Sequence, residues 1–370
     1  MADTPPVELV VAGKRYGGWQ SIQITRSLET LAGGFALTVT ERWAGQPKPW
    51  PIADDAECAV LVDGVPVITG FIDTTDTGFD LSDRATSVRG RDRAADLVDS
   101  SAQLDAWSFK NVDVLTLAKK ICTPFKVNVT MQAGIASPTV TIPKQHGINP
   151  GDTAAEALAG VLKVAGLLAV SDGRGGLTLT RAGSDRVASV LVEGLNAKVA
   201  RAKFDVSQRF RNYIVLGSSK GADGLEGAAA AGVRGTATDL GARATRTLIV
   251  RSNVSMTPAL AKQRAEWEAS TRAARGESVS VTVQGWTESP SEVVWPLNKL
   301  VRVKLPSCRI DGEGLIVGVT LSADGNGGTT TTLDLRNPAS FTPDPTIARL
   351  GGAASGLGRS NYWREIEKGV

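Results

Sequence analysis

The chain has 370 residues, of which 42% are hydrophobic and 21% charged, a composition typical of a globular protein with two to four domains. Its 41 basic and 38 acidic residues leave a formal net charge of +3, which argues against a dedicated nucleic-acid binder, because such proteins carry a concentrated basic excess. The N-terminus has no secretory signal, and the most apolar stretch, residues 154–170, is shorter than the ~20 residues that cross a bilayer and contains Glu156 and Lys163. We therefore expect a protein made and assembled in the cytoplasm.

Residues 1–100 are predicted to form a β-domain. Apolar and polar residues alternate at 21–25 and 35–40, the pattern of strands with one buried face. Asp63-Gly64 between two apolar runs predicts a tight hairpin, and Pro66 suits a strand start or an edge because it cannot donate to a ladder. One antiparallel sandwich or barrel would accommodate these strands.

Residues 101–185 are predicted to form a small α+β domain. Apolar residues from Val114 to Cys122 follow helical spacing, so they predict one amphipathic helix. Thr153 and Glu156 have the spacing of a capping box, which predicts the start of a second helix, and Gly166 is expected to end it.

The remainder of the chain returns to β-structure after a predicted hairpin around 172–176. We expect a second β-domain over 186–340, with a Gly/Ala-rich loop at 218–246 and a helix at 258–275. Residues 341–370 are rich in proline and glycine and are expected to form an extended tail. The predicted fold class is mainly β with an α+β insert.

A faint internal echo links the two predicted β-domains. The segments 60–62, 69–73 and 87–90 resemble, in the same order, the segments 301–303, 316–319 and 333–337. Strands of β-sandwiches share such patterns by chance, but a duplicated β-domain would also leave this echo.

Histidine and cysteine, the usual metal ligands and nucleophiles, are few. The only histidine, His146, lies beside a glycine, so we interpret it as a surface or interface residue rather than a general base. Cys58, Cys122 and Cys308 are far apart and show no CxxC spacing, so we interpret them as buried free thiols. We expect no metal and no cofactor.

Three further motifs have both a chemical and a structural interpretation. Asp54-Asp55 and the pair Glu266 and Glu268 could suggest a glycosidase, but we interpret them as a turn and as solvated surface. The glycine-rich run 173–176 lies between predicted strands rather than before a helix, so we interpret it as a hairpin loop and not a phosphate cradle. We therefore expect no catalytic residue.

Two groups of basic residues could bind phosphate, but acidic residues are interleaved with them. The arginines are Arg84, Arg89, Arg91 and Arg93 in one group and Arg264, Arg272 and Arg275 in the other. We interpret both groups as ion-paired surface or subunit contact.

The C-terminal tail contains one apolar segment, with Tyr362, Trp363 and Ile366 after glycine-rich sequence. An aromatic residue there has no local core to join. These three residues are either a docking anchor for a neighbouring protein or part of an unattached end. If they are an anchor, deleting residues 345–370 should weaken docking to a neighbour while leaving the fold intact.

An ordered set of short segments carries a family resemblance. The segments are 17–29, 32–35, 69–73, 90–99 (Gly90-Arg91-Asp92-Arg93-Ala94-Ala95-Asp96-Leu97-Val98-Asp99), 121–127, 235–239 and 285–287. In these segments the chain resembles the family of phage Mu-like baseplate hub proteins, to about residue 340. The loop at 218–246 and the tail match least.

This resemblance implies a structural protein of the contractile-tail baseplate, related to the hub domains of type VI secretion spikes. Such hubs are implied to be homotrimers in which each chain contributes two tail-tube-like β-barrel or sandwich domains. The resulting pseudo-sixfold ring would join the hexameric tail tube to the trimeric central spike. Its channel would let the tape-measure protein and DNA pass.

The resemblance also implies where the protein acts and with which partners. The implied partners are the spike, the tail tube or a tube-initiator protein, the tape-measure protein and other baseplate proteins, with no membrane contact. The implied location is the virion tail baseplate, assembled in the host cytoplasm. A tail-associated protein that binds the cell wall, with 101–185 as its binding module, or that degrades peptidoglycan remains the alternative.

Overall fold

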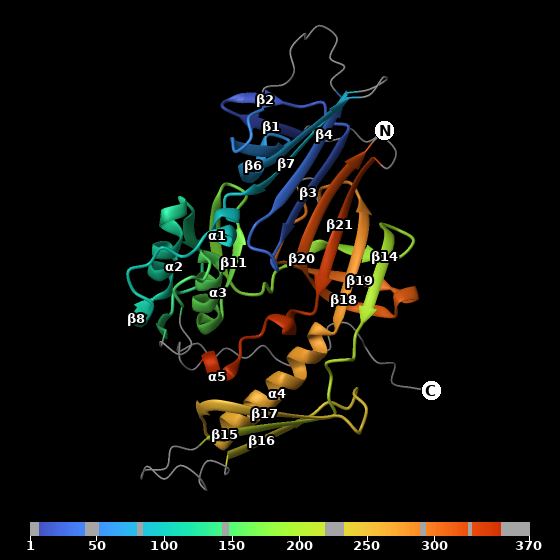
Figure 1. Ribbon diagram of the computed structural model, residues 1–370. Coiled ribbons are helices and arrows are strands. Elements are labelled where there is room, and N and C mark those ends of the chain that lie inside the picture. Colours follow the sequence, from blue (N-terminus) through green and yellow to red (C-terminus); the bar gives the residue numbers. More distant parts are fainter. Residues whose placement is uncertain are drawn as a thin grey trace.

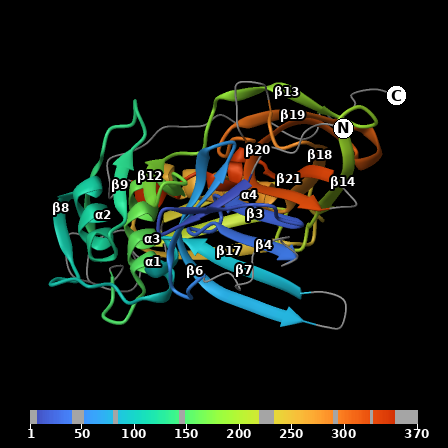
Figure 2. The same ribbon diagram turned by 90° about the horizontal axis from the view of Figure 1, so that it is seen from above.

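The computed structural model describes residues 7–40, 52–79, 84–142, 148–218, 233–288, 294–324 and 328–348 (Figure 1). The fold is mainly β, as the sequence predicts. One sheet of 13 strands runs through the described residues, and three smaller sheets accompany it. Figure 2 shows helices α2 and α3 gathered to one side of the large sheet.

The first part of the large sheet is an antiparallel unit formed by β3 to β7, with β1 and β2 at its outer end. Its strands are β1 (Val7–Val11), β2 (Lys14–Tyr16), β3 (Ser21–Ser27), β4 (Gly34–Thr40), β5 (Glu57–Val62), β6 (Val65–Phe79) and β7 (Arg84–Asp92). They pair in the order β3-β4-β7-β6-β5-β1-β2. The predicted Asp63-Gly64 hairpin is confirmed, and both residues adopt the positive φ values, 49° and 76°, that such a turn requires.

The second part repeats this arrangement. Its strands are β13 (Arg186–Val192), β14 (Ala197–Phe204), β18 (Glu277–Gln284), β19 (Leu300–Leu305), β20 (Ile310–Asp324) and β21 (Gly328–Arg336). They pair in the order β14-β18-β21-β20-β19-β13, so each strand has a counterpart in the first part. The faint internal echo of the sequence falls on these counterparts. We call β3 to β7 the first sheet unit, and β14 with β18 to β21 the second sheet unit.

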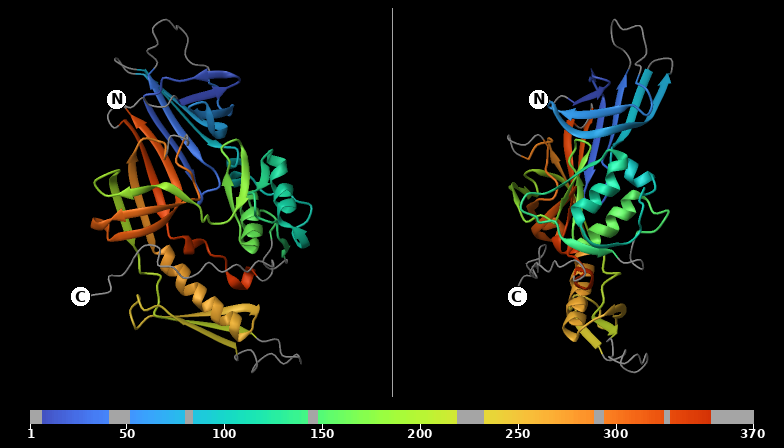
Figure 3. Two further views of the ribbon diagram at one scale, coloured as in Figure 1. Left: turned by 180° about the vertical axis from the view of Figure 1, so that it is seen from behind. Right: turned by 90° about the vertical axis from the view of Figure 1, so that its left-hand side faces the viewer.

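The two sheet units join edge to edge in the same chain. Strand β20 pairs antiparallel with β3 from Gly318 opposite Ser27 to Ala323 opposite Ile22, and we call this pairing the seam. One apolar core lies under both units and includes Leu37 and Leu333, which are fully buried. The seam therefore makes the two units one continuous hydrogen-bonded sheet (Figure 3).

The middle domain lies between the two units in the chain. Its elements are α1 (Ala95–Asp99), β8 (Phe109–Asp113), α2 (Val114–Cys122), η1 (Thr123–Phe125), β9 (Asn128–Met131), β10 (Thr139–Ile142), α3 (Ala154–Ala165), β11 (Leu168–Ser171) and β12 (Gly176–Thr180). The predicted capping box is confirmed, because Thr153 and Glu156 each accept a hydrogen bond from the other's backbone N–H. Gly166 ends α3 in the left-handed conformation, as predicted, and β11 and β12 form the predicted hairpin.

A small lobe is inserted between β14 and β18. It consists of β15 (Asn212–Ser218), β16 (Val233–Thr238), β17 (Thr247–Ser255) and α4 (Pro258–Arg275). The predicted helix at 258–275 is confirmed, with Thr257 as its cap. The prediction of a loop throughout 218–246 is wrong for Val233–Thr238, which forms the edge strand β16.

Small residues in β16 let α4 pack directly on the strand. A Cβ atom on Gly235 would lie 2.0 Å from the backbone carbonyl carbon of Ala261 in α4, so glycine is needed there for close approach rather than for a loop. A short helix, η3 (Pro306–Cys308), connects β19 to β20, and the described chain finishes with η4 (Pro338–Phe341) and α5 (Pro345–Ala348) after β21. Among the described residues, no helix has the length and apolar character to span a bilayer.

Candidate interaction surfaces

The segment after the last strand is fastened to α4. The indole Nε1 of Trp267 donates a hydrogen bond of 2.7 Å to the carbonyl oxygen of Thr342. The Arg264 guanidinium lies over the Trp267 ring, 4.5 Å from its centroid, and forms an ion pair with Asp344. These contacts hold residues 342–344, the first part of the expected tail, against α4.

Glu268 lies at the centre of the same network. Its carboxylate contacts Arg264 and Arg272, each at 2.8 Å, and its side chain is only 7% exposed. The prediction of solvated surface is therefore wrong for Glu268, because η4 and Asp344 cover this face of α4. The predicted turn at Asp54-Asp55 is confirmed.

An apolar groove of about 1360 Å³ lies between α3, α4 and residues 340–345. Leu158 and Leu162 line it from α3, Trp267 from α4, and Phe341 and Pro343 from the C-terminal segment. Its apolar lining could hold an aliphatic or aromatic side chain of another segment.

The middle domain is attached to the large sheet by a buried polar junction. The Asp92 carboxylate accepts hydrogen bonds from the backbone N–H groups of Gly33, at 2.8 Å, and Ala94, at 2.9 Å. Arg26 on β3 donates to the carbonyl oxygen of Ser171 on β11, at 3.1 Å. Burial raises the pKa of Asp92, against hydrogen bonds and the nearby Arg26 charge that favour the ionised form. Arg26, Asp92 and Ser171 thus orient the middle domain against β3 and β7.

Four arginines of the two basic groups are ion-paired, as predicted. Arg91 bridges Asp73, at 2.8 Å, and Asp99, at 2.7 Å. Hydrogen bonds that Arg91 donates to these carboxylates raise the pKa of Arg91, and the same guanidinium lowers the pKa of Asp99. Arg93 pairs with Glu57, and Arg264 and Arg272 pair as described above. These side chains are already engaged within the chain.

The cysteines are free. Cys58 and Cys122 are buried, as predicted, and burial raises the pKa of each thiol to about 12, whereas Cys308 is half-buried. In the part of the chain that the structure describes, no three His, Cys, Asp or Glu side chains are placed to share a metal ion. His146 lies outside the described residues.

The proposed docking residues of the tail also lie outside the described residues. These are Tyr362, Trp363 and Ile366. The described chain ends at α5, and Pro345 at the start of that helix lines the apolar groove.

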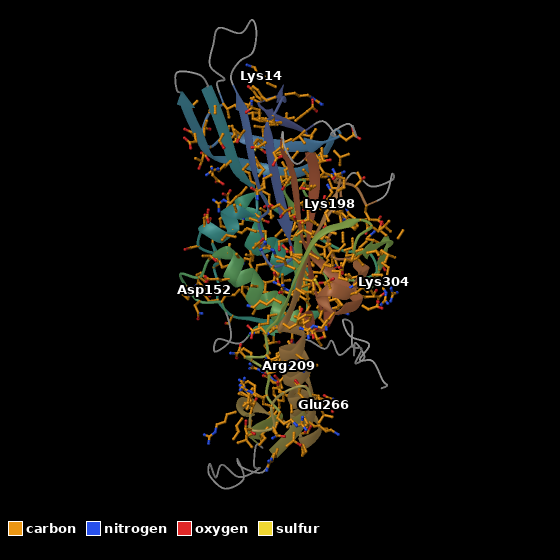
Figure 4. All side chains as sticks on the ribbon, turned by 90° about the vertical axis from the view of Figure 1, so that its right-hand side faces the viewer. Lys14, Asp152, Lys198, Arg209, Glu266 and Lys304 are labelled. Carbon is orange, nitrogen blue, oxygen red and sulfur yellow. The ribbon has the colours of Figure 1, made fainter. Side chains whose placement is uncertain are left out.

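The large sheet has two edges that the sequence did not predict. Among the described strands, β14 pairs only with β18, apart from a single bridge between Ala197 and Glu193, and from Asp73 onward β6 pairs only with β7. Figure 4 views the molecule from the β14 side and shows Lys198 on this outer strand. Lys198, Arg201 and Lys203 on β14 carry the signal that sequence reasoning missed, since basic residues are common on edge strands.

Three parts of the chain match families of tail proteins. Residues 6–92 match the family described as "Mu phage baseplate assembly protein GpP-like, N-terminal". Residues 94–181 match "Baseplate hub protein gp44-like, second domain", and residues 257–344 match "Mu phage baseplate assembly protein GpP, fourth domain".

Whole-chain comparisons agree with these matches. The chain is 28% identical to the baseplate hub protein gp44 of Escherichia phage Mu over 334 residues, which cover 89% of this chain and 87% of that protein. It is 31% identical to the 43 kDa tail protein of prophage MuSo2 from Shewanella oneidensis, with a TM-score of 0.78 over 91% of this chain and 99% of the other. A tail protein from Neisseria meningitidis MC58 is 25% identical, with a TM-score of 0.75 over 93% and 99% of the two chains.

Proposed function

Because the chain belongs to the family of phage Mu-like baseplate hub proteins, we propose that three copies form a ring at the centre of a contractile-tail baseplate. The ring joins the hexameric tail tube on one side to the trimeric central spike on the other. It is a symmetry adaptor, and its partners are these two structures, or a tube-initiator protein, together with other baseplate proteins.

One observation carries this proposal, namely the duplication of the sheet unit. The orders β3-β4-β7-β6-β5 and β14-β18-β21-β20-β19 are the same arrangement, used twice in one chain. A trimer of such chains presents six similar units to a sixfold partner, while parts present once per chain, such as the middle domain and the small lobe, face a threefold partner.

Each domain has its own role in the proposed ring. Residues 1–100 and 186–340 act as the two tube-like domains, and 101–185 acts as a separate small domain. The family matches to 6–92 and 94–181 support a boundary between the first two. The insertion of residues 212–275 as a small lobe refines the second tube-like domain. The tail, 341–370, reaches a neighbouring protein through Tyr362, Trp363 and Ile366.

The ring acts without catalysis and leaves a channel. The tape-measure protein and DNA pass through this channel during genome ejection, and the near balance of 41 basic and 38 acidic residues suits a passage that does not grip DNA. The protein works in the virion tail baseplate after assembly in the host cytoplasm, away from any membrane.

Native mass spectrometry of the concentrated full-length chain, alone and mixed with its cognate spike protein, tests the ring. We expect trimers that bind the spike. A chain that stays monomeric at high concentration and also fails to bind the spike would contradict the proposal. Zymography on peptidoglycan tests the non-enzymatic role, since a clearing zone would favour the alternative of a wall-degrading tail protein.

A further inference from the structure

The two sheet units correspond residue by residue, not only strand by strand. In β6, Asp73 is an extra residue between Ile72, opposite Gly90, and Thr74, opposite Arg89. In β20, Val317 is an extra residue between Ile316 and Gly318 at the same place in the ladder with β21. Ile72 and Ile316 are both buried. The bulges therefore align 72–79 of β6 with 316–323 of β20.

The first strands of the units align through their neighbours in the same way. Ile24 of β3 pairs with Phe35 of β4, and Ala202 of β14 pairs with Val279 of β18. Phe35 and Val279 are themselves equivalent, because they pair with the equivalent residues Gly90 and Leu335. Ala202 thus corresponds to Ile24, and Lys203 corresponds to Thr25.

The seam shows how the strand edge of one sheet unit pairs with the strand edge of the other. Across it, Thr320 lies opposite Thr25, with their hydroxyl oxygens 3.4 Å apart, and buried Leu321 lies opposite buried Ile24. The bulge at Val317 turns its carbonyl oxygen toward the neighbouring unit, where it accepts a hydrogen bond of 2.7 Å from the backbone N–H of Leu28.

The equivalent strand edges on the far sides of the units are open in the single chain. From Thr74 onward β6 has β7 on one side and no described strand on the other, and β18 is the only described strand that pairs with residues 199–203 of β14. Thr74, Asp76 and Thr77 are exposed, and the Lys203 side chain is 75% exposed. Each chain thus carries one free copy of each half of the seam.

We propose that β6 of one copy pairs antiparallel with β14 of the next copy, in the register that β20 and β3 use within the chain. The equivalences between β6 and β20 and between β14 and β3 convert the seam register into residue pairs. Asp76 then lies opposite Lys203, Thr77 opposite Ala202 and Gly78 opposite Arg201. The inference rests on the proposed ring and gives the contact that closes it.

The charges of the two edges fit this register. Asp76 and Lys203 take the places of Thr320 and Thr25, so an ion pair between strands stands where the seam has two adjoining hydroxyl groups. The edge of β14 is basic, which discourages pairing of β14 with another β14, whereas β6 offers an acidic residue at the matching position.

An exposed apolar residue beside β14 supports the same pairing. Val206 is 53% exposed, and counting along the chain makes it the counterpart of Leu28, which is 8% exposed in the seam. In the proposed contact the bulge at Asp73 presents the carbonyl oxygen equivalent to that of Val317. The contact is head to tail, so each chain donates one edge and accepts one, and the arrangement closes into a ring.

Cysteine cross-linking between two differently substituted chains tests the register. Residues opposite each other in an antiparallel pair have Cα atoms about 4.5–5.5 Å apart, a separation that a disulfide spans. Asp76→Cys chains are mixed with Lys203→Cys chains, both carrying Cys308→Ser because Cys308 is the half-buried native thiol. Under mild oxidation we expect a covalent dimer in the mixture, absent from either chain alone and reversed by reductant.

A register control uses Thr74→Cys in place of Asp76→Cys, two residues along the same edge. We expect at least about fivefold less dimer with Lys203→Cys, because a diagonal pair is about 7–8 Å apart. Equal yields from the two pairs would overturn the proposed register.

Charge reversal gives a second measurement that does not depend on oxidation. We expect Asp76→Lys to weaken association roughly tenfold by placing like charges opposite each other. The double variant Asp76→Lys with Lys203→Asp should restore association to within about threefold. Failure of the double variant to recover would overturn the pairing.

The outcomes separate this inference from the proposed function. Trimers in native mass spectrometry without the Asp76–Lys203 cross-link would overturn the strand pairing and leave the hub ring standing. Absence of trimers, spike binding and cross-link together would overturn both.

Discussion

Thr25 and Thr320 are 295 residues apart in the chain, yet their hydroxyl oxygens lie 3.4 Å from each other across the seam between β3 and β20. This pairing joins two sheet units that would otherwise be separate domains. It fixes the angle between the units, and in a ring built from such chains it also fixes half of the contacts between units.

The first prediction concerns the apolar layer of the seam. Leu321 is 1% exposed and faces Ile24, so Leu321→Ala should lower the free energy of unfolding by roughly 2–5 kcal/mol. Ser322→Ala, at the next and only partly buried position, should change it by less than about 1 kcal/mol. Urea denaturation of the full-length variants measures both values, and similar losses at the two positions would show that the seam has no apolar core of its own.

Local signals predicted most of the elements but none of the long-range pairing. Thr153 and Glu156 predict the start of α3, and Asp63-Gly64 predicts a hairpin, because caps and tight turns depend on residues a few positions apart. The seam joins residues nearly 300 positions apart, and no periodicity within either strand specifies such a partner. The internal sequence echo is the only signal related to the seam, and it indicates a duplicated domain rather than a contact between the two copies.

Two errors have the same physical origin. Glycine and alanine around Val233–Thr238 predict a loop, whereas Gly235 allows close packing of this strand against α4. The polar sequence around Glu268 predicts solvent exposure, whereas Asp344 and Arg264 come together over its side chain only in the folded chain. In both cases the deciding neighbour is distant in sequence.

The second prediction tests the packing of α4 on β16. Gly235→Ala would place a Cβ atom 2.0 Å from the Ala261 carbonyl carbon, so the helix must shift, and we expect a loss of about 1–3 kcal/mol. Gly160→Ala is the matched control. It lies within α3 with no atom within 4 Å of the added Cβ, and it should gain roughly 0.5–1 kcal/mol from helix propensity. Thermal denaturation compares the two, and a stabilising Gly235→Ala would contradict the packing argument.

The third prediction concerns the pH dependence of the buried junction. Burial raises the pKa of Asp92 above its ordinary value, so the folded state binds the proton more tightly than the unfolded chain does. The stabilisation from this proton is present below about pH 4, the unfolded pKa, and is lost as pH rises through the folded pKa. Relative to Asp92→Asn, the native protein should therefore lose stability as pH rises from about 4, by about 1.4 kcal/mol for each unit by which the pKa is raised.

Asp99→Asn provides the control of opposite sign for that experiment. The hydrogen bond from Arg91 lowers the pKa of Asp99, so its contribution is present above the unfolded pKa and is lost as pH falls through the folded one. Urea denaturation in steps from about pH 2 to pH 8 measures both differences, because the Asp99 contribution is lost below about pH 4 and the Asp92 contribution above it. A native protein that gains stability relative to Asp92→Asn as pH rises would contradict the assignment.

The last prediction concerns the tail and where to cut it. Thr346 accepts a hydrogen bond of 3.1 Å from Arg264, and Asp344 pairs with the same guanidinium, so a deletion from residue 345 would also remove part of the fastening to α4. Deleting 349–370 instead keeps every one of these contacts. We expect the deletion to leave the melting temperature within about 2 °C of the native value, because no described core residue is lost.

Docking should respond differently from folding. If Trp363 is the anchor proposed above, Trp363→Ala should weaken binding to the neighbouring baseplate protein about thirtyfold, the effect of removing a hot-spot aromatic residue, and deletion of 349–370 should do at least as much. Glu367→Ala, four residues along the same tail, should change binding less than threefold, as rim positions do. Calorimetric titration against the cognate spike protein and the tail-tube protein in turn measures these effects. Native affinity of the deleted chain for both partners would show that the tail is an unattached end.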